Sequence, residues 1–102
     1  MDQIIDKFIE GSLNSAQIIF STHYERRIME RELNRENIVN MIINEDYLDF
    51  YEDLNKKNNY LIHFPSDKPN YDIVVAITAQ NDKIIVMTVY EKRKDKYKIK
   101  II

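Results

Sequence analysis

Residues 71–90 read YDIVVAITAQNDKIIVMTVY. The first part, Tyr71 to Thr78, is rich in Val and Ile, which favour strands. Residues 79–83 are polar, and Ile84 to Tyr90 is again apolar. Two strand-forming runs joined by a short polar turn predict an antiparallel β-hairpin. This hairpin decides the fold, because the other segments must pack against it.

Further strands are expected on either side of the hairpin. Residues 47–51 (YLDFY) and 59–64 (NYLIHF) have strand character, and Pro65 closes the second of these runs. Residues 99–102 (IKII) predict a last edge strand, and residues 17–20 (QIIF) are either a strand or an extended lead-in.

The part of the chain before residue 45 carries helical patterns. Ile4, Ile5, Phe8 and Ile9 recur at helical spacing and predict a helix that Asp2 caps and that ends near Gly11-Ser12. Asn34 caps another predicted helix, in which Ile38, Val39, Ile42 and Ile43 form the buried stripe and which stops near Asn44. Leu33 and Ile38 have the spacing of a hydrophobic staple.

Between these two helices the sequence predicts a third, from Thr22 to about Arg31. Thr22 with Glu25 three residues later has the pattern of a capping box. In such a helix His23, Arg27 and Arg31 lie one turn apart on one face. Three cationic or titratable groups stacked in this way require an anion, which is either the protein's own carboxylates, such as Glu30, or a bound phosphate.

Helices followed by an antiparallel meander predict an α+β fold, with the N-terminal helices packed on one face of a twisted antiparallel sheet. The 102 residues are expected to form a single domain, 1–102. With one Gly and two Pro, the turns must be made by Asn, Asp and Ser.

Composition excludes several classes of function. The chain has no Cys and only two His, so no ligand set of familiar metal-binding spacing is present, and no cofactor is expected. One Gly rules out a glycine-rich phosphate loop. No apolar run reaches the roughly 20 residues of a membrane span, and no signal peptide is evident. A cytoplasmic location is therefore expected, without membrane contact.

Charge is distributed unevenly along the chain, although the net charge is only −2. Residues 45–53 are acidic and residues 92–100 are basic. The basic run is either a solvated edge strand or a patch that follows a phosphate backbone. Tyr90 and Tyr97 are either ordinary strand residues or stacking platforms for bases. His63 is expected to be structural unless it lies close to His23.

The residues Thr22-His23-x-x-x-Arg27-Ile28-x-x-Arg31-x-Leu33, followed by a capped helix and a strand ending Val86-Met87-Thr88-Val89-Tyr90, resemble a family of uncharacterised bacterial and archaeal domains. The pattern of that family is His-Ala-x-x-Arg-Met-x-x-Arg-Gly-Ile, and the resemblance covers roughly Phe20 to Arg93. The family is related to the RelE/ParE-like toxins, whose helices pack on a twisted antiparallel sheet.

The resemblance implies a toxin-type domain that acts on RNA as a metal-independent ribonuclease. His23 is then the general acid or base, Arg27 stabilises charge on the phosphate, and Tyr90 completes the catalytic set. Substrate-binding residues are then Arg31, Thr88, Arg93 and Lys94. The alternative is a non-catalytic binding domain of the same fold, which engages nucleic acid or a protein partner such as a cognate antitoxin. Neither reading fixes the oligomeric state.

Overall fold

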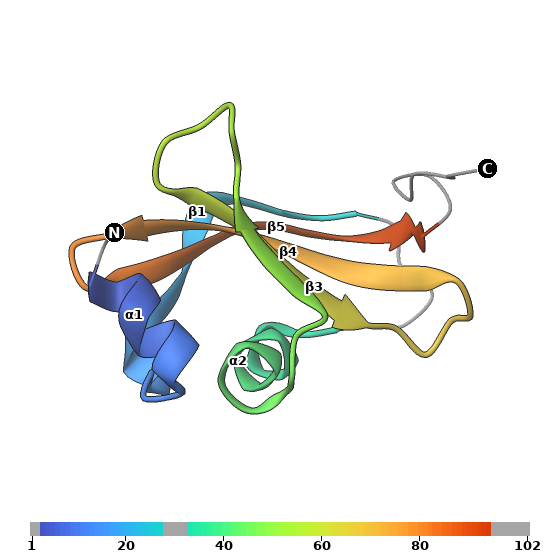
Figure 1. Cartoon of the computed structure of the whole chain (residues 1–102), viewed down its shortest axis with the longest axis horizontal. Coiled ribbons are helices and arrows are strands. Elements are labelled where there is room, and N and C mark those ends of the chain that lie inside the picture. The colour runs from blue at the N-terminus through green and yellow to red at the C-terminus, as the bar shows by residue number, and fades with distance from the viewer. Residues whose placement is uncertain (1–2, 28–32, 95–102) are drawn as a thin grey trace.

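The computed structural model describes residues 3–27 and 33–94, and within them it has an α+β fold (Figure 1). The sequence prediction of this class is confirmed. The elements in chain order are α1 (Gln3–Glu10), the 3-10 helix η1 (Ser15–Gln17), β1 (Ile18–Arg26), α2 (Arg35–Asn44), β2 (Asp49–Glu52), β3 (Asn59–Pro65), β4 (Tyr71–Gln80) and β5 (Lys83–Arg93). The predicted strand 99–102 lies outside the described residues.

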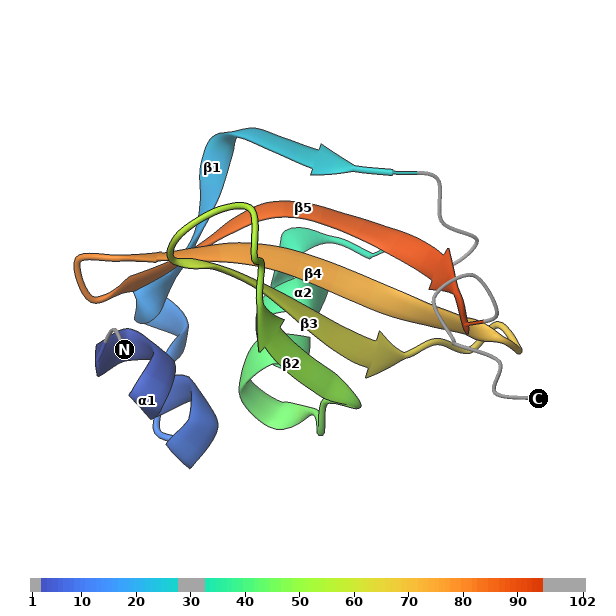
Figure 2. The same ribbon diagram turned by 45° about the horizontal axis from the view of Figure 1, so that its top comes forward.

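The five strands form one mixed sheet in the order β1-β5-β4-β3-β2 (Figure 2). Strands β2 to β5 are an antiparallel meander, as predicted. Strand β1 is added to the edge of β5 in the parallel direction, with Ile18 opposite Ile84 and Phe20 opposite Val86. This parallel edge strand departs from the antiparallel sheet that the sequence predicted.

The predicted helix from Thr22 to Arg31 is wrong over its described residues. Residues 22–26 belong to β1, and residues 28–32 lie outside the described chain. Thr22 and Glu25 therefore form no capping box; the capping box of this region lies earlier, where the Asn14 backbone N–H donates to Gln17 Oε1 (3.1 Å). The local pattern failed because β5, far away in the sequence, offers backbone partners to this segment.

Asparagine and aspartate make the turns, as the scarcity of Gly and Pro predicted. Asn58, Asn70, Asn81 and Asp82 all have positive φ, which these two residue types tolerate best after glycine. Asn81 and Asp82 join β4 to β5 in a two-residue hairpin turn between Gln80 and Lys83. Glycine serves at the end of α1, where Gly11 has a φ of 75° and the Ser12 N–H donates to Lys7 O, a Schellman end.

Helix α2 begins and ends where the sequence predicted. The Asn34 side chain accepts a hydrogen bond from the Asn37 N–H (2.8 Å), and the helix ends at Asn44. Leu33 and Ile38, the predicted staple, are both buried. The buried stripe differs slightly from the prediction, because Met41 is buried in place of Val39 and Ile43, which are partly buried against the core.

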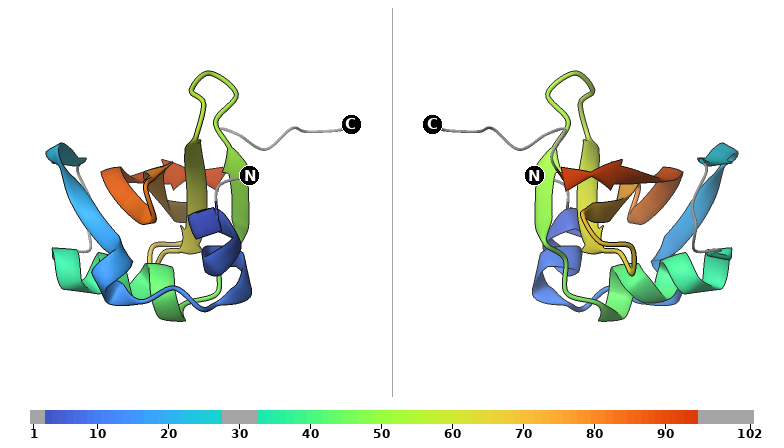
Figure 3. Two further views of the ribbon diagram at one scale, coloured as in Figure 1. Left: turned by 90° about the vertical axis from the view of Figure 1, so that its left-hand side faces the viewer. Right: turned by 90° about the vertical axis from the view of Figure 1, so that its right-hand side faces the viewer.

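Both helices cover the same face of the sheet, which Figure 3 shows end-on. This core face contributes Ile62 and Phe64 from β3, and Ile73, Val75 and Ile77 from β4, to a single apolar cluster with α1 and α2. The opposite face, called the open face below, carries the alternate residues of the same strands. The loop between β2 and β3 rises above this open face (Figures 1 and 3).

Candidate functional site

The open face of the sheet holds a cleft of about 640 Å³. One wall is the β2–β3 loop, which contributes Asp53 and Lys56, and the other side is reached by Arg27, directly after β1. Its remaining lining comes chiefly from β3, β4 and the second half of β5. The cleft therefore lies where β1, β5 and the loop converge, on the side of the sheet without helices.

The charges that line the cleft are predominantly positive. Four basic side chains and two acidic side chains contribute to it, namely Arg27, Lys56, Lys92, Arg93, Asp53 and Glu91. The chain as a whole has a net charge of −2, so this excess of positive charge is local. A local basic cleft in an acidic protein favours an anionic ligand at that place.

Arg27 and Tyr90 form the most specific contact in the cleft. The Arg27 guanidinium carbon lies 5.1 Å from the centre of the Tyr90 ring, a cation–π arrangement. The Arg27 backbone N–H also donates to Val89 O (3.0 Å), which continues the pairing of β1 with β5. A stacked guanidinium keeps its N–H edge available, and that edge suits two oxygens of a phosphate.

Thr88 ties the two strands together beside this contact. Its hydroxyl donates to Glu25 O (3.0 Å) just past the point where the β1–β5 register shifts. Burial is the main cause that raises the pKa of Tyr90; the positive charge of Arg27 opposes the rise and Asp53 adds to it. The Tyr90 phenol is therefore neutral at physiological pH and can donate a hydrogen bond.

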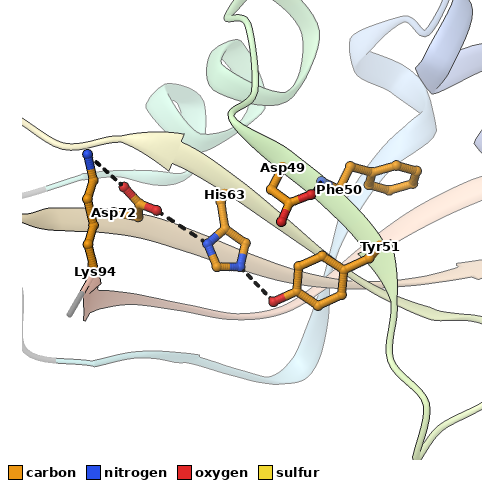
Figure 4. Close-up of polar contacts among 6 residues, drawn as sticks. All are labelled: Asp49, Phe50, Tyr51, His63, Asp72 and Lys94. Carbon is orange, nitrogen blue, oxygen red and sulfur yellow. Dashed lines mark hydrogen bonds and ion pairs between the residues drawn. The ribbon is translucent and has the colours of Figure 1, made fainter. Parts of the chain in front are cut away.

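A second polar array on the open face was not predicted from the sequence (Figure 4). Tyr51 Oη lies 2.8 Å from His63 Nε2, and His63 Nδ1 lies 3.5 Å from Asp72 Oδ2. Lys94 Nζ lies 3.7 Å from Asp72 Oδ1. His63 and Asp72 are almost fully buried, whereas Tyr51 is 38% exposed. We call Tyr51, His63 and Asp72 the buried relay.

The structure brings some of the predicted site residues together in the cleft and places others elsewhere. Arg27, Thr88, Tyr90 and Arg93 line the cleft together. Lys94, predicted to bind substrate, pairs with Asp72. Arg31 lies outside the described residues.

His23 does not share the cleft with Tyr90. It is an exposed residue of β1 and is not among the described residues that line the cleft. The helical stripe of His23 and Arg27 does not exist, because this segment is a strand. His63 lies on β3, three positions from β1 in the sheet order, so the two histidines are far apart.

No local sequence pattern could have revealed the buried relay. Its three residues lie on three strands and meet only through strand register, in which His63 is opposite both Asp49 and Val74, and Asp72 is opposite Pro65. The one available clue was His63 itself, an imidazole within the mainly apolar run of β3.

The described residues provide neither a metal-binding cluster nor a membrane-spanning helix. Over residues 3–27 and 33–94 there is no group of three or more His, Asp or Glu that could hold a metal ion. In the same ranges, none of the helices has the length and apolar character needed to cross a membrane.

Comparison with known families identifies the chain. It matches the family described as "Domain of unknown function (DUF4258)" over residues 20–91, and it therefore belongs to that family. No curated protein and no solved structure shows significant similarity to it. The matched range contains β2 to β4, most of β1 and β5, Arg27, Tyr90 and the buried relay.

Proposed function

We propose that this chain is a RelE/ParE-like toxin-type domain that binds single-stranded RNA in the open-face cleft and cleaves it without a metal ion. The observation that carries the proposal is the Arg27 guanidinium stacked on Tyr90 in a cleft lined mainly by basic residues. Single-stranded RNA is recognised in this way by other proteins, through phosphate contacts and bases stacked on aromatic or guanidinium planes.

Each side of the cleft has a separate task in binding. Arg27 holds the phosphate at the reacting position, where its planar fork engages two oxygens. Lys92 and Arg93, at the end of β5, follow the backbone on one side, and Lys56 of the loop does so on the other. The Tyr90 hydroxyl and Thr88 supply neutral polar contacts to sugar or base.

Cleavage uses the RNA's own 2′-hydroxyl as the nucleophile. Its oxygen attacks the adjacent phosphorus, and negative charge develops on the two remaining phosphate oxygens. Arg27 stabilises that charge because its guanidinium is fixed by the Tyr90 ring before the reaction. The reaction needs only a base for the 2′-hydroxyl and a proton for the leaving oxygen.

The binding test compares two arginines that differ in the face they occupy. Arg27→Gln removes the charge over Tyr90, whereas Arg35→Gln removes a similar charge over Phe20 and Tyr24 at the start of α2. A fluorescent single-stranded RNA is titrated with each protein at several salt concentrations. Arg27→Gln should weaken binding about 10- to 100-fold and reduce the slope against log salt by about one; Arg35→Gln should match the wild type.

Two outcomes contradict RNA binding at this cleft. One is equal weakening by both substitutions, and the other is an absence of RNA binding by the wild type at low salt. In the second case the protein-partner alternative gains weight. A complex with an antitoxin through an apolar contact should change little with salt, whereas RNA binding should weaken steeply.

Growth after inducible expression in bacteria tests the toxin-type activity. Wild type should arrest growth, and Arg27→Gln, shown to be folded by circular dichroism, should not. Sequencing of RNA ends from arrested cells then identifies the cleaved positions. Arrest that persists with Arg27→Gln would separate toxicity from the proposed site.

A further inference from the structure

The buried relay has the arrangement of a proton-transfer chain that ends at the border of the cleft. Its inner members, His63 and Asp72, are 2% and 4% exposed, and its outer member Tyr51 is 38% exposed. Burial of a histidine and a carboxylate costs free energy unless the two groups interact. The contact between His63 and Asp72 offsets part of that cost. Tyr51 is therefore the member of the buried relay that a ligand can contact.

Tyr51 adjoins the cleft that binds RNA in the proposal above. It is paired across the strands with Leu61, which lines that cleft. Its pKa is raised, first by burial and then by Asp49, Tyr90 and Asp53, of which the last two also line the cleft. Tyr51 therefore shares its electrostatic environment with Tyr90 and the β2–β3 loop.

Tautomer assignment gives the relay a direction. With the proton of neutral His63 on Nδ1, that nitrogen lies 3.5 Å from Asp72 Oδ2 in a charge contact, and Nε2 accepts the hydrogen bond of the Tyr51 hydroxyl. A carboxylate behind a histidine orients the ring and stabilises its protonated form. In this state the Tyr51 oxygen can receive a proton only as it passes its own to His63.

We propose that Tyr51 is the catalytic base for RNA cleavage, and that His63 and Asp72 are its positioning residues. The proposal rests on the proposed function and names the group that takes the proton from the 2′-hydroxyl. It replaces His23 in that role.

The step conserves atoms and protons. The 2′-hydroxyl gives its proton to Tyr51 Oη, and the Tyr51 proton moves to His63 Nε2. The O2′–P bond forms and the P–O5′ bond breaks, while the leaving 5′-oxygen takes a proton from water. The products are a 2′,3′-cyclic phosphate and a 5′-hydroxyl end. The imidazolium, paired with Asp72, then returns its proton to the hydroxide left in solvent.

The first experiment compares Tyr51→Phe with Tyr47→Phe. Both substitutions remove one phenolic hydroxyl from a tyrosine of similar exposure, 38% and 42%, but Tyr47 stacks on Phe8 of α1, away from the cleft. Tyr51→Phe should cleave a labelled single-stranded RNA at least about 100-fold more slowly than wild type. It should bind a non-cleavable 2′-deoxy version of the same strand as tightly as wild type does. Tyr47→Phe should match wild type in both measurements.

The second experiment tests Asp72 by measuring rate and binding separately. Asp72→Asn should cleave the labelled strand more slowly than wild type and bind its 2′-deoxy version as tightly, and adding it to Tyr51→Phe should slow cleavage no further, because Asp72 acts only through Tyr51. A merely structural role for Asp72 would weaken binding together with the rate, or slow the double variant further. Folding of every variant is checked by circular dichroism; if Asp72→Asn does not fold, the Tyr51→Phe comparison decides.

The outcomes separate the two proposals. Cleavage by Tyr51→Phe at the wild-type rate overturns the relay as the base and leaves the RNA-cleaving function standing. A wild-type protein that neither binds nor cleaves RNA overturns both. Equal loss of cleavage and of 2′-deoxy RNA binding in Tyr51→Phe makes Tyr51 a binding residue and also overturns its role as the base.

Discussion

The two faces of strand β4 show how one strand serves stability and chemistry at the same time. Ile73, Val75 and Ile77 point to the helices and are fully buried in the apolar core. Asp72 points to the open face and is nearly as buried, at 4% exposure, yet its neighbours there are His63 and Lys94. Burial on the two faces is similar, but the core face buries apolar side chains alone, whereas the open face buries the carboxylate of Asp72 beside the apolar Val74.

The two faces therefore contribute differently to the stability of the fold. Apolar burial on the core face contributes stability that is largely independent of pH and salt. A buried carboxylate and histidine contribute little net stability, because desolvation offsets their attraction. Their presence on the open face is therefore better explained by a chemical task than by folding.

Truncation on the core face should have the largest effect. Ile73→Ala removes apolar atoms from a fully buried side chain opposite Phe64, and should lower the free energy of unfolding by about 2–5 kcal/mol. Urea denaturation followed by far-ultraviolet circular dichroism measures this, because the chain has no Trp. Ile9→Ala, at a position 50% exposed, is the control and should cost much less. Similar costs for both variants would show that the core face is not where stability is concentrated.

A neutral hydrogen bond on the open face should have a smaller effect. Thr88→Val keeps the shape of the side chain but removes the hydroxyl that donates to Glu25 O. The expected loss is about 1 kcal/mol, and hydrogen exchange should be faster in the Arg27 N–H, which pairs with Val89 O beyond that point. Unchanged exchange at Arg27 would mean that the backbone pairing of β1 holds without Thr88.

The smallest effect on stability should come from the ionisation of tyrosines, which lie on both faces of the sheet. Burial is the largest cause that raises the pKa of Tyr24, Tyr51 and Tyr90 above the ordinary value of 10.0. Since the folded chain holds these protons more tightly than the unfolded chain, the associated stability is complete below pH 10 and declines as the pH rises further. Near-ultraviolet absorbance of phenolate, recorded against pH, should lose one late-titrating group in Tyr51→Phe. An unchanged late phase would contradict the raised pKa of Tyr51.

Local patterns predicted the parts of the fold that local interactions decide. The cap at Asn34, the end of α1 near Gly11 and the β4–β5 hairpin each depend on residues within a few positions of one another. The segment that failed, residues 22–26, has the local pattern of a helix start but is held by pairing with β5. Phe20 and Tyr24 are four positions apart, a spacing that places them on one side of a helix and also on one face of a strand. In the strand their rings pack edge to face.

The residues of the candidate site also differ in whether the sequence could identify them. The resemblance suggested Arg27 and Tyr90 as members of one site, and the two side chains are in contact. The assignment of His23 relied on helical spacing and lost its basis when the segment proved to be a strand. Tyr51, His63 and Asp72 could not be grouped from the sequence, because strand register alone brings them together.

The parallel pairing of β1 with β5 also sets a time at which the protein becomes complete. Thr88 and Glu25, which hold the two strands together, are 63 positions apart in the chain. Contacts of such long range form late, because closing the long loop between them costs conformational entropy. While the ribosome is still making β4, Arg27 has no Tyr90 to stack on, and β1 has no strand to join. A chain in synthesis therefore carries no finished cleft, and the proposed cleavage of RNA can begin only after β5 has left the ribosome.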